Sequence, residues 1–480
     1  MKMQFKSISL LVLAAALGFS SCKKEASVNT PNGDFDRSSK ALFPDTHALP
    51  TATGTISGLI TSNITLTNDK VWFINGPTFV DSTVTITIQA GTYVKGMAAS
   101  TTTSGFPSYL VIRRGAKINA VGTTANPIVF TSAKAAGQRA KGDWGGVVLL
   151  GNAPTNQAKP QIEGIPATQI PAGLAGKDAI GYGGSIEADN SGTLRNVRIE
   201  FAGVIVDASL GNELNALTLG GVGAGTIIDH VQASYGADDG FEFFGGSVNA
   251  KFLISYGNDD DDLDFDQGYQ GSIQFALAAK DLSLPFSTSP NGIESNNISS
   301  PIVTTGGAFA SRLTQPVLSN ISFIGGATAG PTAGIGHLFR VGSSYKVRNS
   351  INFGFNNGAT LINTTGSEYS NSYVHGFTSA VTGAALTSTA VTSLTGANPN
   401  TTIKLVNPFS ATSPDWRIQA TAPAGIRTGA VFTGLAVTHP GGTFSAFDTT
   451  PTYLGAFGLQ TAARWDSGGW ASYEPFTNAY

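Results

Sequence analysis

The chain has 480 residues and a formal net charge of −3, but only 12% of its residues are Asp, Glu, Lys or Arg, about half the share of an average soluble domain. It carries 59 glycines, and together with the low charge this excludes coiled coils and helical bundles, which need charged faces and avoid glycine. A hydrophobic share of 41% can bury a core and argues against disorder. The near-neutral balance offers no basic surface, so we expect no nucleic-acid partner.

The first residues of the chain have the pattern of an export signal. Lys2 and Lys6 precede an apolar run over residues 8–19, which is too short to span a bilayer. The single cysteine of the chain, Cys22, follows this run, so no intramolecular disulfide can form. The arrangement resembles a bacterial lipoprotein signal, in which the cysteine is lipidated and becomes the new N-terminus. The alternative is ordinary cleavage near Ser21, with Cys22 incidental.

The pattern along the chain predicts four parts. Residues 1–21 are expected to be the signal peptide, and residues 22–50, rich in Ser, Asn, Pro and charge, a flexible tether. Residues 51–455 are expected to form the folded domain, and residues 456–480 a cap that closes its end. The resemblance to lipoproteins implies a membrane anchor through the lipid on Cys22, an outer-membrane location and exposure at the cell surface. We expect the anchored protein to be a monomer.

Short runs of β-branched and aromatic residues follow, separated by Gly, Asn and Asp turns, which is typical of β-strands. Their regular recurrence suits either a sandwich with hairpins or a solenoid with one coil per repeat. Sandwich hairpins usually carry tight Asn-Gly or Asp-Gly turns. In this chain the turns differ while the strand phrases resemble one another, which favours a solenoid. Four such strands are expected at residues 84–88, 109–112, 128–131 and 147–150.

The clearest internal repeat has an offset of 22 residues. Residues 231–236 align with residues 253–258, and residues 238–246 align with residues 260–268. A third copy is expected to start another 22 residues on, at Phe275. This third copy takes an eight-residue insertion and resumes at residues 291–296. Stacked rungs bury a continuous apolar column that no single rung can bury. Because the repeats contain no helix, the period indicates an all-β fold, a right-handed parallel β-helix with rungs of about 20–22 residues.

Four phrases of the sequence resemble the β-helix surface lipoproteins of Bacteroidota. They occupy residues 87–96, 142–152, 212–223 and 238–242. The resemblance covers about residues 50–480. It implies the fold and export to the cell surface, but it implies no particular activity.

Acidic residues are concentrated in one stretch of the chain. Ten of the 31 acids lie in the 38 residues between Asp229 and Asp266, where Lys251 is the single base. The 22-residue register stacks them on adjacent rungs, and strand alternation directs their carboxylates away from the interior. Three columns are expected: Glu242, Asp264 and Glu294; Asp239, Asp261 and Asn291; and Phe244, Asp266 and Asn296.

Stacked like charges in a sheet repel each other. The cations near these columns are Lys251, Lys280 and Arg340, too few to neutralise ten acids, so we expect a bound metal ion. Oxygen ligands without cysteine favour Ca²⁺ ahead of Mg²⁺. Two alternatives stay open: Asp and Asn as solvated turn formers, or a catalytic carboxylate pair without metal. The candidate ligands are Asp238, Asp239, Glu242, Asp260, Asp261, Asp262, Asp264, Asp266 and Glu294.

Three functional classes are consistent with these residues. The first, which we favour, is a non-catalytic glycan-binding or adhesin-like surface protein whose acidic rungs hold structural Ca²⁺. The second is a polysaccharide lyase, since a β-helix with Ca²⁺ on acidic rungs resembles pectate lyases in architecture. Lys280 or Arg340 would then remove the proton next to a uronate carboxylate. The third is a glycoside hydrolase in which Glu242 and Asp264 act as paired acid and base.

Aromatic residues on or near the acidic rungs allow two interpretations. Exposed rings beside polar groups could stack on the faces of sugars, whereas buried rings would belong to the core of the coil. For each ring taken alone, the core is the favoured interpretation. The residues concerned are Trp144, Tyr235, Phe244, Tyr256 and Tyr269.

Overall fold

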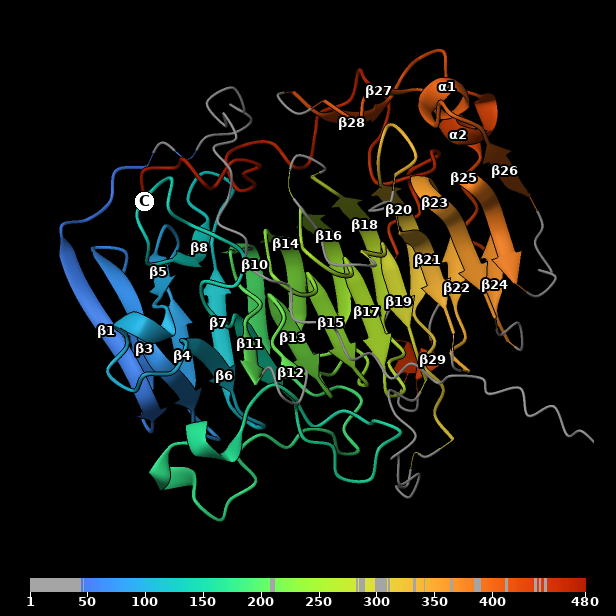
Figure 1. Cartoon of the computed structure of the whole chain (residues 1–480). Coiled ribbons are helices and arrows are strands. Elements are labelled where there is room, and N and C mark those ends of the chain that lie inside the picture. The colour runs from blue at the N-terminus through green and yellow to red at the C-terminus, as the bar shows by residue number, and fades with distance from the viewer. Residues whose placement is uncertain are drawn as a thin grey trace, which may run out of the picture.

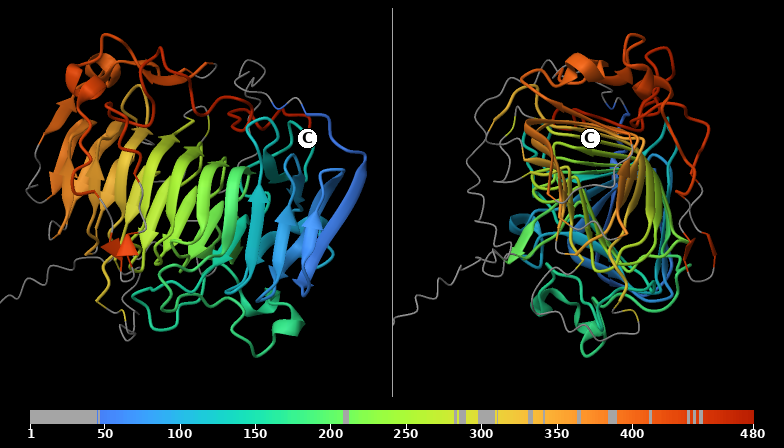
Figure 2. Two further views of the ribbon diagram at one scale, coloured as in Figure 1. Left: turned by 180° about the vertical axis from the view of Figure 1, so that it is seen from behind. Right: turned by 90° about the vertical axis from the view of Figure 1, so that its right-hand side faces the viewer.

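The chain forms a long coil of parallel strands, which make one 24-stranded sheet in the described residues (Figure 1). The end-on view in Figure 2 shows the coil in cross-section. The fold class predicted from the sequence, a right-handed parallel β-helix, is confirmed. The computed structural model describes residues 45, 47–207, 212–281, 284, 290–297, 309, 311–330, 334–340, 342–362, 366–383, 390–410, 413–435, 438–439, 442–443 and 447–480.

The strands stack on three faces of the coil, and the longer strands bend from one face to the next. Face 1 holds β6 (Tyr109–Ile112), β9 (Val147–Leu150), β13 (Leu217–Gly220), β15 (Phe241–Phe244), β17 (Leu263–Asp266), β19 (Ile293–Ser295), β21 (Ile335–Phe339) and the second halves of β1 (Ala52–Ile60), β3 (Lys70–Val80), β23 (Ile351–Leu361) and β25 (Ser372–Gly383).

Faces 2 and 3 share several strands that bend between them. Face 2 holds β2 (Ile64–Leu66), β4 (Thr85–Ile88), β7 (Lys117–Val121), β22 (Lys346–Arg348), β24 (Glu368–Ser370) and the first halves of β10 (Gly192–Glu200), β14 (Ile227–Ser234), β16 (Asn249–Tyr256), β18 (Ser272–Ala279) and β20 (Val317–Ile324). Face 3 holds β5 (Tyr93–Gly96), β8 (Ile128–Ser132), β26 (Val391–Thr395), the second halves of β10, β14, β16, β18 and β20, and the first halves of β1, β3, β23 and β25.

Alternation along each strand places one set of side chains inside the coil. Phe241, Phe243, Leu263 and Phe265 of β15 and β17 all belong to the buried interior cluster. The rings of Phe243 and Phe265 stack from rung to rung with centroids 5.1 Å apart. The interior is therefore a continuous apolar column that runs from rung to rung, as the repeat predicted.

The predicted register is correct for the first two copies and one residue off at the third. Asp264 pairs with Glu294, which confirms the eight-residue insertion between these rungs. Leu253, however, pairs with Ala276 and not with Phe275. The reason is a longer turn, because residues 267–271 connect β17 to β18 where only residues 245–248 connect β15 to β16.

A column of left-handed residues forms the corner between faces 2 and 3. A positive φ bends the strand at this point, and Asn tolerates it better than bulky residues do. The three bulky members lie on neighbouring rungs, and their rings stack with centroids 4.3 and 4.9 Å apart. The column consists of Asn196, His230, Phe252, Phe275, Asn320, Asn349 and Asn371, with φ between 44° and 60°.

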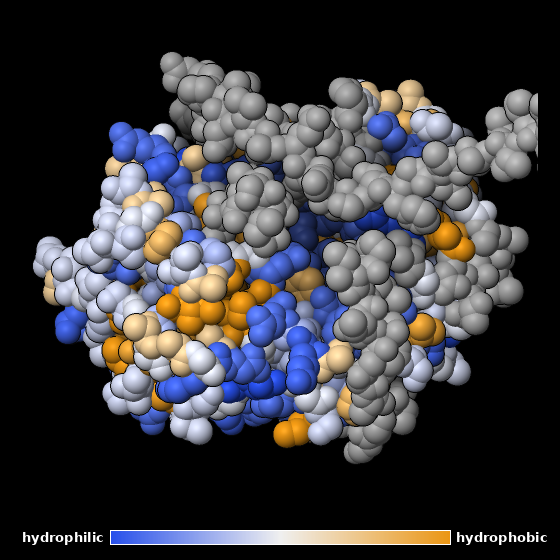
Figure 3. Space-filling view, turned by 60° about the horizontal axis from the view of Figure 1, so that its bottom comes forward, coloured by the Kyte–Doolittle hydropathy of each residue, from blue (hydrophilic) through white to orange (hydrophobic). Residues whose placement is uncertain are grey.

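Between β9 and β10 the chain leaves the coil for residues 151–191 and packs over part of face 1, at the bottom of Figure 1. We name this segment the excursion. Its buried side chains, such as Leu174 and Tyr182, pack on outward residues of face 1, such as Val148 and Phe244. Figure 3, with the bottom brought forward, shows apolar surface next to hydrophilic surface. Short elements outside the coil are η1 (Ala99–Thr101), η2 (Ala167–Gln169), η3 (Ala172–Leu174), β11 (Ile205–Asp207) and β12 (Asn212–Glu213).

The C-terminal segment does not close the end of the coil as expected. The coil ends with β26, and the chain then returns along the top of the molecule toward the first rungs (Figure 1, Figure 2). Trp470, Tyr473 and Phe476 cover outward apolar residues of face 3, which would otherwise be exposed. Tyr480 lies beside Tyr93 of β5, with ring centroids 5.2 Å apart. This segment contains α1 (Asn400–Ile403), β27 (Leu405–Asn407), β28 (Asp415–Ile418), α2 (Ala424–Thr428), β29 (Thr438–His439) and β30 (Gly442–Thr443).

The predicted signal peptide, Cys22 and most of the predicted tether lie outside the described residues. The first strand of the coil begins at Ala52. Within the described residues, none of the helices has the length and apolar character needed to cross a membrane.

Candidate metal centre

The acidic columns form on face 1 in the predicted register. Glu242, Asp264 and Glu294 occupy the middle of β15, β17 and β19 and pair directly with one another. The neighbouring rungs carry Thr218 before this column and Leu338 after it. The acidic part of the column therefore spans three rungs and ends at an uncharged residue on both sides.

The carboxylates point away from the interior of the coil, yet most of them are not at the surface. Only 6% of Asp239 and 5% of Glu242 is exposed. The excursion crosses the ends of the same strands, where Tyr182 donates a hydrogen bond to Gln267 at 2.6 Å and contacts Phe244. The predicted outward direction is therefore correct, but the alternative of solvated carboxylates is wrong for Asp239 and Glu242, which are buried. The excursion contributes to this at Glu242, since Glu163 lies near enough for its charge to raise the pKa of Glu242.

One acidic column forms a ladder with the backbone of the following rung. Asn215 Oδ1 accepts the amide of Asp239 at 3.2 Å, and Asp239 Oδ1 accepts the amide of Asp261 at 2.9 Å. In the same way, Asp261 accepts the amide of Asn291, and Asn291 accepts the amide of Ile335, each at 3.0 Å. Each Asp uses one oxygen to fix the turn, and this explains why Asp and Asn share the column.

Asp262 lies apart from the other acids. Its carboxylate pairs with Lys280 Nζ at 3.1 Å and accepts a hydrogen bond from Ser255 at 2.6 Å. Lys280 also donates to the carbonyl oxygen of Asp260 at 2.7 Å, and only 2% of its side chain is exposed. The structure thus places the predicted ligand Asp262 and the predicted base Lys280 together, in a buried ion pair.

Two further predicted site residues, the candidate base Arg340 and the candidate ligand Asp266, also form specific contacts. Arg340 pairs with Glu294 and donates through Nε to Asn296 at 3.2 Å. Asp266 accepts the backbone amide of Gln267 at 2.6 Å. Arg340 therefore neutralises the last acid of the first column.

The remaining acids form two overlapping groups. In one group, one carboxylate oxygen each from Asp239, Glu242 and Asp264 lie within 4.8 Å of one another. In the other, Asp238, Asp239 and Asp260 do so over the same distance. The Oδ1 atom of Asp264 is buried, and among the described residues it has no hydrogen-bond partner. We name these two groups, in this order, the first and the second triad, and their five residues together the acidic pair of triads.

Burial and neighbouring carboxylates raise the pKa values of all three acids in the first triad. Burial has the largest effect on the pKa of Asp239, followed by the charges of Asp238 and Asp261. Burial also raises the pKa of Glu242 well above its usual range, as it does for Asp264. In the absence of a cation, the site therefore favours the protonated acids.

Two residues of this site were missed in the sequence. Asn215 donates a hydrogen bond to Glu242 and begins the ladder. The offset of 22 residues points from Asp239 to Leu217, whereas this rung is offset by 24 residues, so the repeat alone does not find Asn215. Glu163 is an exposed residue of the excursion, and its negative charge raises the pKa of Glu242. No repeat pattern relates Glu163 to the rungs, so nothing local in the sequence indicates its position.

The aromatic residues on or near the acidic rungs belong to the core. Each of the five rings is buried, so none of them offers an exposed face to a sugar. Trp144, Tyr235 and Tyr269 have no exposed surface, and Phe244 and Tyr256 have 3% and 6%.

The fold and the site together define the class of this protein: a parallel β-helix with a buried cluster of carboxylates on one face. The family follows from comparison of the sequence: the chain belongs to the pectate-lyase-like β-helix domain family, whose model matches residues 58–422. The crystal structure of pectate lyase Pel9A is similar at 13% identity and a TM-score of 0.30, over 87% of this chain and 98% of that chain. No curated protein matches the sequence.

Proposed function

We propose that this protein is a non-catalytic, lipid-anchored β-helix of the outer membrane that binds glycans, and that Ca²⁺ at the acidic pair of triads stabilises its fold. The observation that carries the metal is the buried Asp264 Oδ1, which lacks a partner in the described residues. It belongs to a carboxylate of which one oxygen lies within 4.8 Å of an oxygen of Asp239 and of Glu242. A buried carboxylate oxygen needs a proton, a donor or a cation.

Several features support a cation over a proton. The nearby bases already neutralise other acids: Lys280 pairs with Asp262, and Arg340 pairs with Glu294. The donor set consists of oxygen atoms, which suits a hard cation, and Ca²⁺ accepts six to eight such ligands. Asp239, Glu242 and Asp264 would hold the ion first, and Asp238 and Asp260 offer the second group of oxygens.

The non-catalytic part of the proposal rests on the two candidate bases. A lyase needs a base that can approach the substrate, whereas Lys280 is almost fully buried in its ion pair. Arg340 has 29% of its side chain exposed, but it is held by Glu294 and Asn296. The family description supports a lyase as the second candidate, and Glu242 and Asp264 as a hydrolase pair would compete with metal binding for the same oxygens.

The lipid anchor rests on the sequence around Cys22 alone. We expect the wild-type protein to incorporate labelled palmitate in a bacterial host and to fractionate with the outer membrane. Cys22→Ser should remove both the label and the membrane association. Label on the Cys22→Ser variant, or none on the wild type, would contradict the anchor.

Thermal unfolding with Ca²⁺ or with EDTA tests the metal. We expect EDTA to lower the melting temperature and Ca²⁺ to restore it, because the ion binds the folded state. The double variant Glu242→Gln/Asp264→Asn should fold and lose this response. Glu368→Gln serves as the matched control, since Glu368 lies on face 2 and pairs with Arg348. A wild-type melting temperature that is the same in both buffers overturns the Ca²⁺ proposal.

Incubation with uronate polysaccharides in Ca²⁺ decides between binding and lysis. A lyase produces an unsaturated uronate that absorbs in the ultraviolet, and a hydrolase releases reducing ends. We expect neither signal over a broad panel of polysaccharides, while a glycan array detects binding. A product signal that disappears in Arg340→Gln or in Glu242→Gln would overturn the non-catalytic part.

A further inference from the structure

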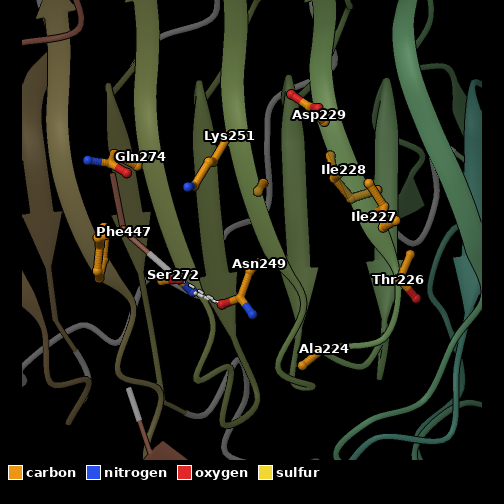
Figure 4. Close-up of a pocket in the computed structure, with 11 residues that line it drawn as sticks. Ala224, Thr226, Ile227, Ile228, Asp229, Asn249, Lys251, Ser272, Gln274 and Phe447 are labelled. Carbon is orange, nitrogen blue, oxygen red and sulfur yellow. Dashed lines mark hydrogen bonds between the residues drawn. The ribbon is translucent and has the colours of Figure 1, made fainter. Parts of the chain in front are cut away.

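Two lysines of the coil lie near an aspartate of another rung, in different surroundings. Lys251 lies opposite Asp229 on face 2, and Figure 4 shows both lining a surface pocket of about 250 Å³. Lys141 lies at the corner between faces 3 and 1, where its Nζ atom is 3.2 Å from Oδ1 of Asp259. Only 15% of the Lys141 side chain and 11% of the Asp259 side chain are exposed. Water therefore reaches the first pair and is largely excluded from the second.

The corner holds both partners of the buried pair in fixed positions. Next to Lys141, the amide of Gly142 donates to the carbonyl oxygen of Ala202 at 3.2 Å. The amide of Asp259 itself donates to the carbonyl oxygen of Gly236 at 3.0 Å. The backbone of the surrounding turns thus keeps the amine and the carboxylate in contact, and such proximity lowers the barrier to a reaction between them.

The buried pair connects loops that are far apart along the chain. Lys141 follows β8, and Asp259 follows β16, 118 residues later. The strands β8, β10, β14 and β16 stack in this order on face 3, so the pair spans four successive rungs. The single cysteine of the chain, Cys22, excludes an internal disulfide. A covalent link across these rungs therefore needs other side chains.

Burial favours the reactive form of the Lys141 amine. It lowers the pKa of Lys141, and the carboxylate of Asp259 opposes this effect without cancelling it, while the positive charge of Lys280 adds to it. The neutral amine is the nucleophilic form of lysine. Burial also disfavours the ion pair relative to an uncharged product, because both charges have lost their water. Asp281, which is 7% exposed and whose charge acts on Lys141, gives the corner a further acid for proton transfer.

We propose that Lys141 and Asp259 condense to an isopeptide bond, which staples four successive rungs of the coil. The Nζ atom attacks Cγ of Asp259, a C–N bond forms and a C–O bond breaks. One carboxylate oxygen and two protons of the ammonium group leave as water, so an ammonium and a carboxylate become a neutral amide. Atoms and charges balance within the pair, and the step needs no oxidant, reductant or cofactor. The bond is independent of the proposed Ca²⁺ site and of glycan binding.

Peptide mapping of the wild-type protein tests the bond. Trypsin cannot cleave after an acylated Lys141 and cleaves poorly before Pro160, so we expect a branched peptide in which residues 140–177 are joined to residues 252–280. Its mass should be lower than the sum of the two chains by the mass of one water molecule. Tandem mass spectrometry should locate the link at Lys141 and Asp259. A succinimide at an aspartate loses the same water but joins no second peptide.

Lys141→Arg is the variant that prevents the bond and keeps the positive charge. It should give no branched peptide, and it should melt at a lower temperature than the wild type, because a cross-link restricts the unfolded chain. Lys251→Arg, at the pair that water reaches, is the matched control. It should keep the branched peptide and the melting temperature of the wild type. Circular dichroism verifies that both variants fold.

The wild-type map decides the proposal even if Lys141→Arg fails to fold. A wild-type digest that contains residues 142–177 and residues 252–280 only as separate peptides overturns the bond, and the pair is then an ordinary buried ion pair. A link between Lys280 and Asp262 in place of Lys141 overturns the assignment to this corner pair.

Discussion

Asp262 and Asp264 lie two residues apart on one rung, and the fold treats them in opposite ways. Asp262 is enclosed by Lys280 and Ser255 and forms a complete buried ion pair. Asp264 meets only other acids in its triad, and one of its oxygens has no partner among the described residues. A local excess of acids is therefore not one site. Asp262 supports the fold through its ion pair, whereas Asp264 lies in the group of acids that we propose binds a cation.

The largest effect is expected when the complete pair is broken. Lys280→Met leaves Asp262 buried without its cation, which should lower the free energy of unfolding by about 3–5 kcal/mol. Urea denaturation measures this loss. The double variant Lys280→Met/Asp262→Asn should recover much of it, since the unpaired charge is then removed. A loss below about 1 kcal/mol for Lys280→Met would place this pair with weak surface pairs and remove the contrast with Asp264.

The pH dependence of stability should separate the buried first triad from acids in more exposed ion pairs, such as Asp229 and Glu368, whose pKa values are lowered. The pKa values of Asp239, Glu242 and Asp264 are raised by burial, so the folded state holds protons more tightly than the unfolded state. Their contribution to stability is present below the unfolded values of 3.8 for Asp and 4.5 for Glu. It is lost as the pH rises from there through the raised pKa values.

In EDTA, the melting temperature of the wild type should therefore fall as the pH rises above about 5. Ca²⁺ should flatten this slope because it takes the place of the protons. The double variant Glu242→Gln/Asp264→Asn should show a smaller slope in EDTA. A melting temperature in EDTA that does not fall over this range would contradict the raised pKa values of the first triad.

The smallest effect is expected at an exposed pair on face 2. Asp229 pairs with Arg195 at 3.0 Å, and the two side chains are 26% and 43% exposed. The charges of His230 and Arg195 keep the pKa of Asp229 below its usual value despite partial burial. Asp229→Asn should change the free energy of unfolding by less than about 1 kcal/mol, because solvent screens the pair. Urea denaturation of Asp229→Asn and of Lys280→Met compares the two losses in the free energy of unfolding. Equal losses would contradict the expected difference between the exposed and the buried pair.

Prediction from the sequence succeeded where the repeat alone decides the structure. The offset of 22 residues placed Glu242, Asp264 and Glu294 in one column, and the pairing confirms it. Prediction failed by one residue at Phe275, because turn length carries no repeat signal. It also failed for the C-terminal segment, since apolar residues at the end of a chain do not reveal which face they cover.

The sequence by itself determined the class of fold, the register of the acidic rungs and the apolar interior, because all three follow from a period that is repeated locally. Only the tertiary structure decided which carboxylates are paired, which remain together, and which face of the coil the C-terminal segment covers. Those outcomes depend on contacts between distant residues, such as Lys141 with Asp259 at 3.2 Å and Gln274 with Asp448 at 2.7 Å. Burial and electrostatic pairing are set by what the folded chain brings together, and no local pattern encodes them.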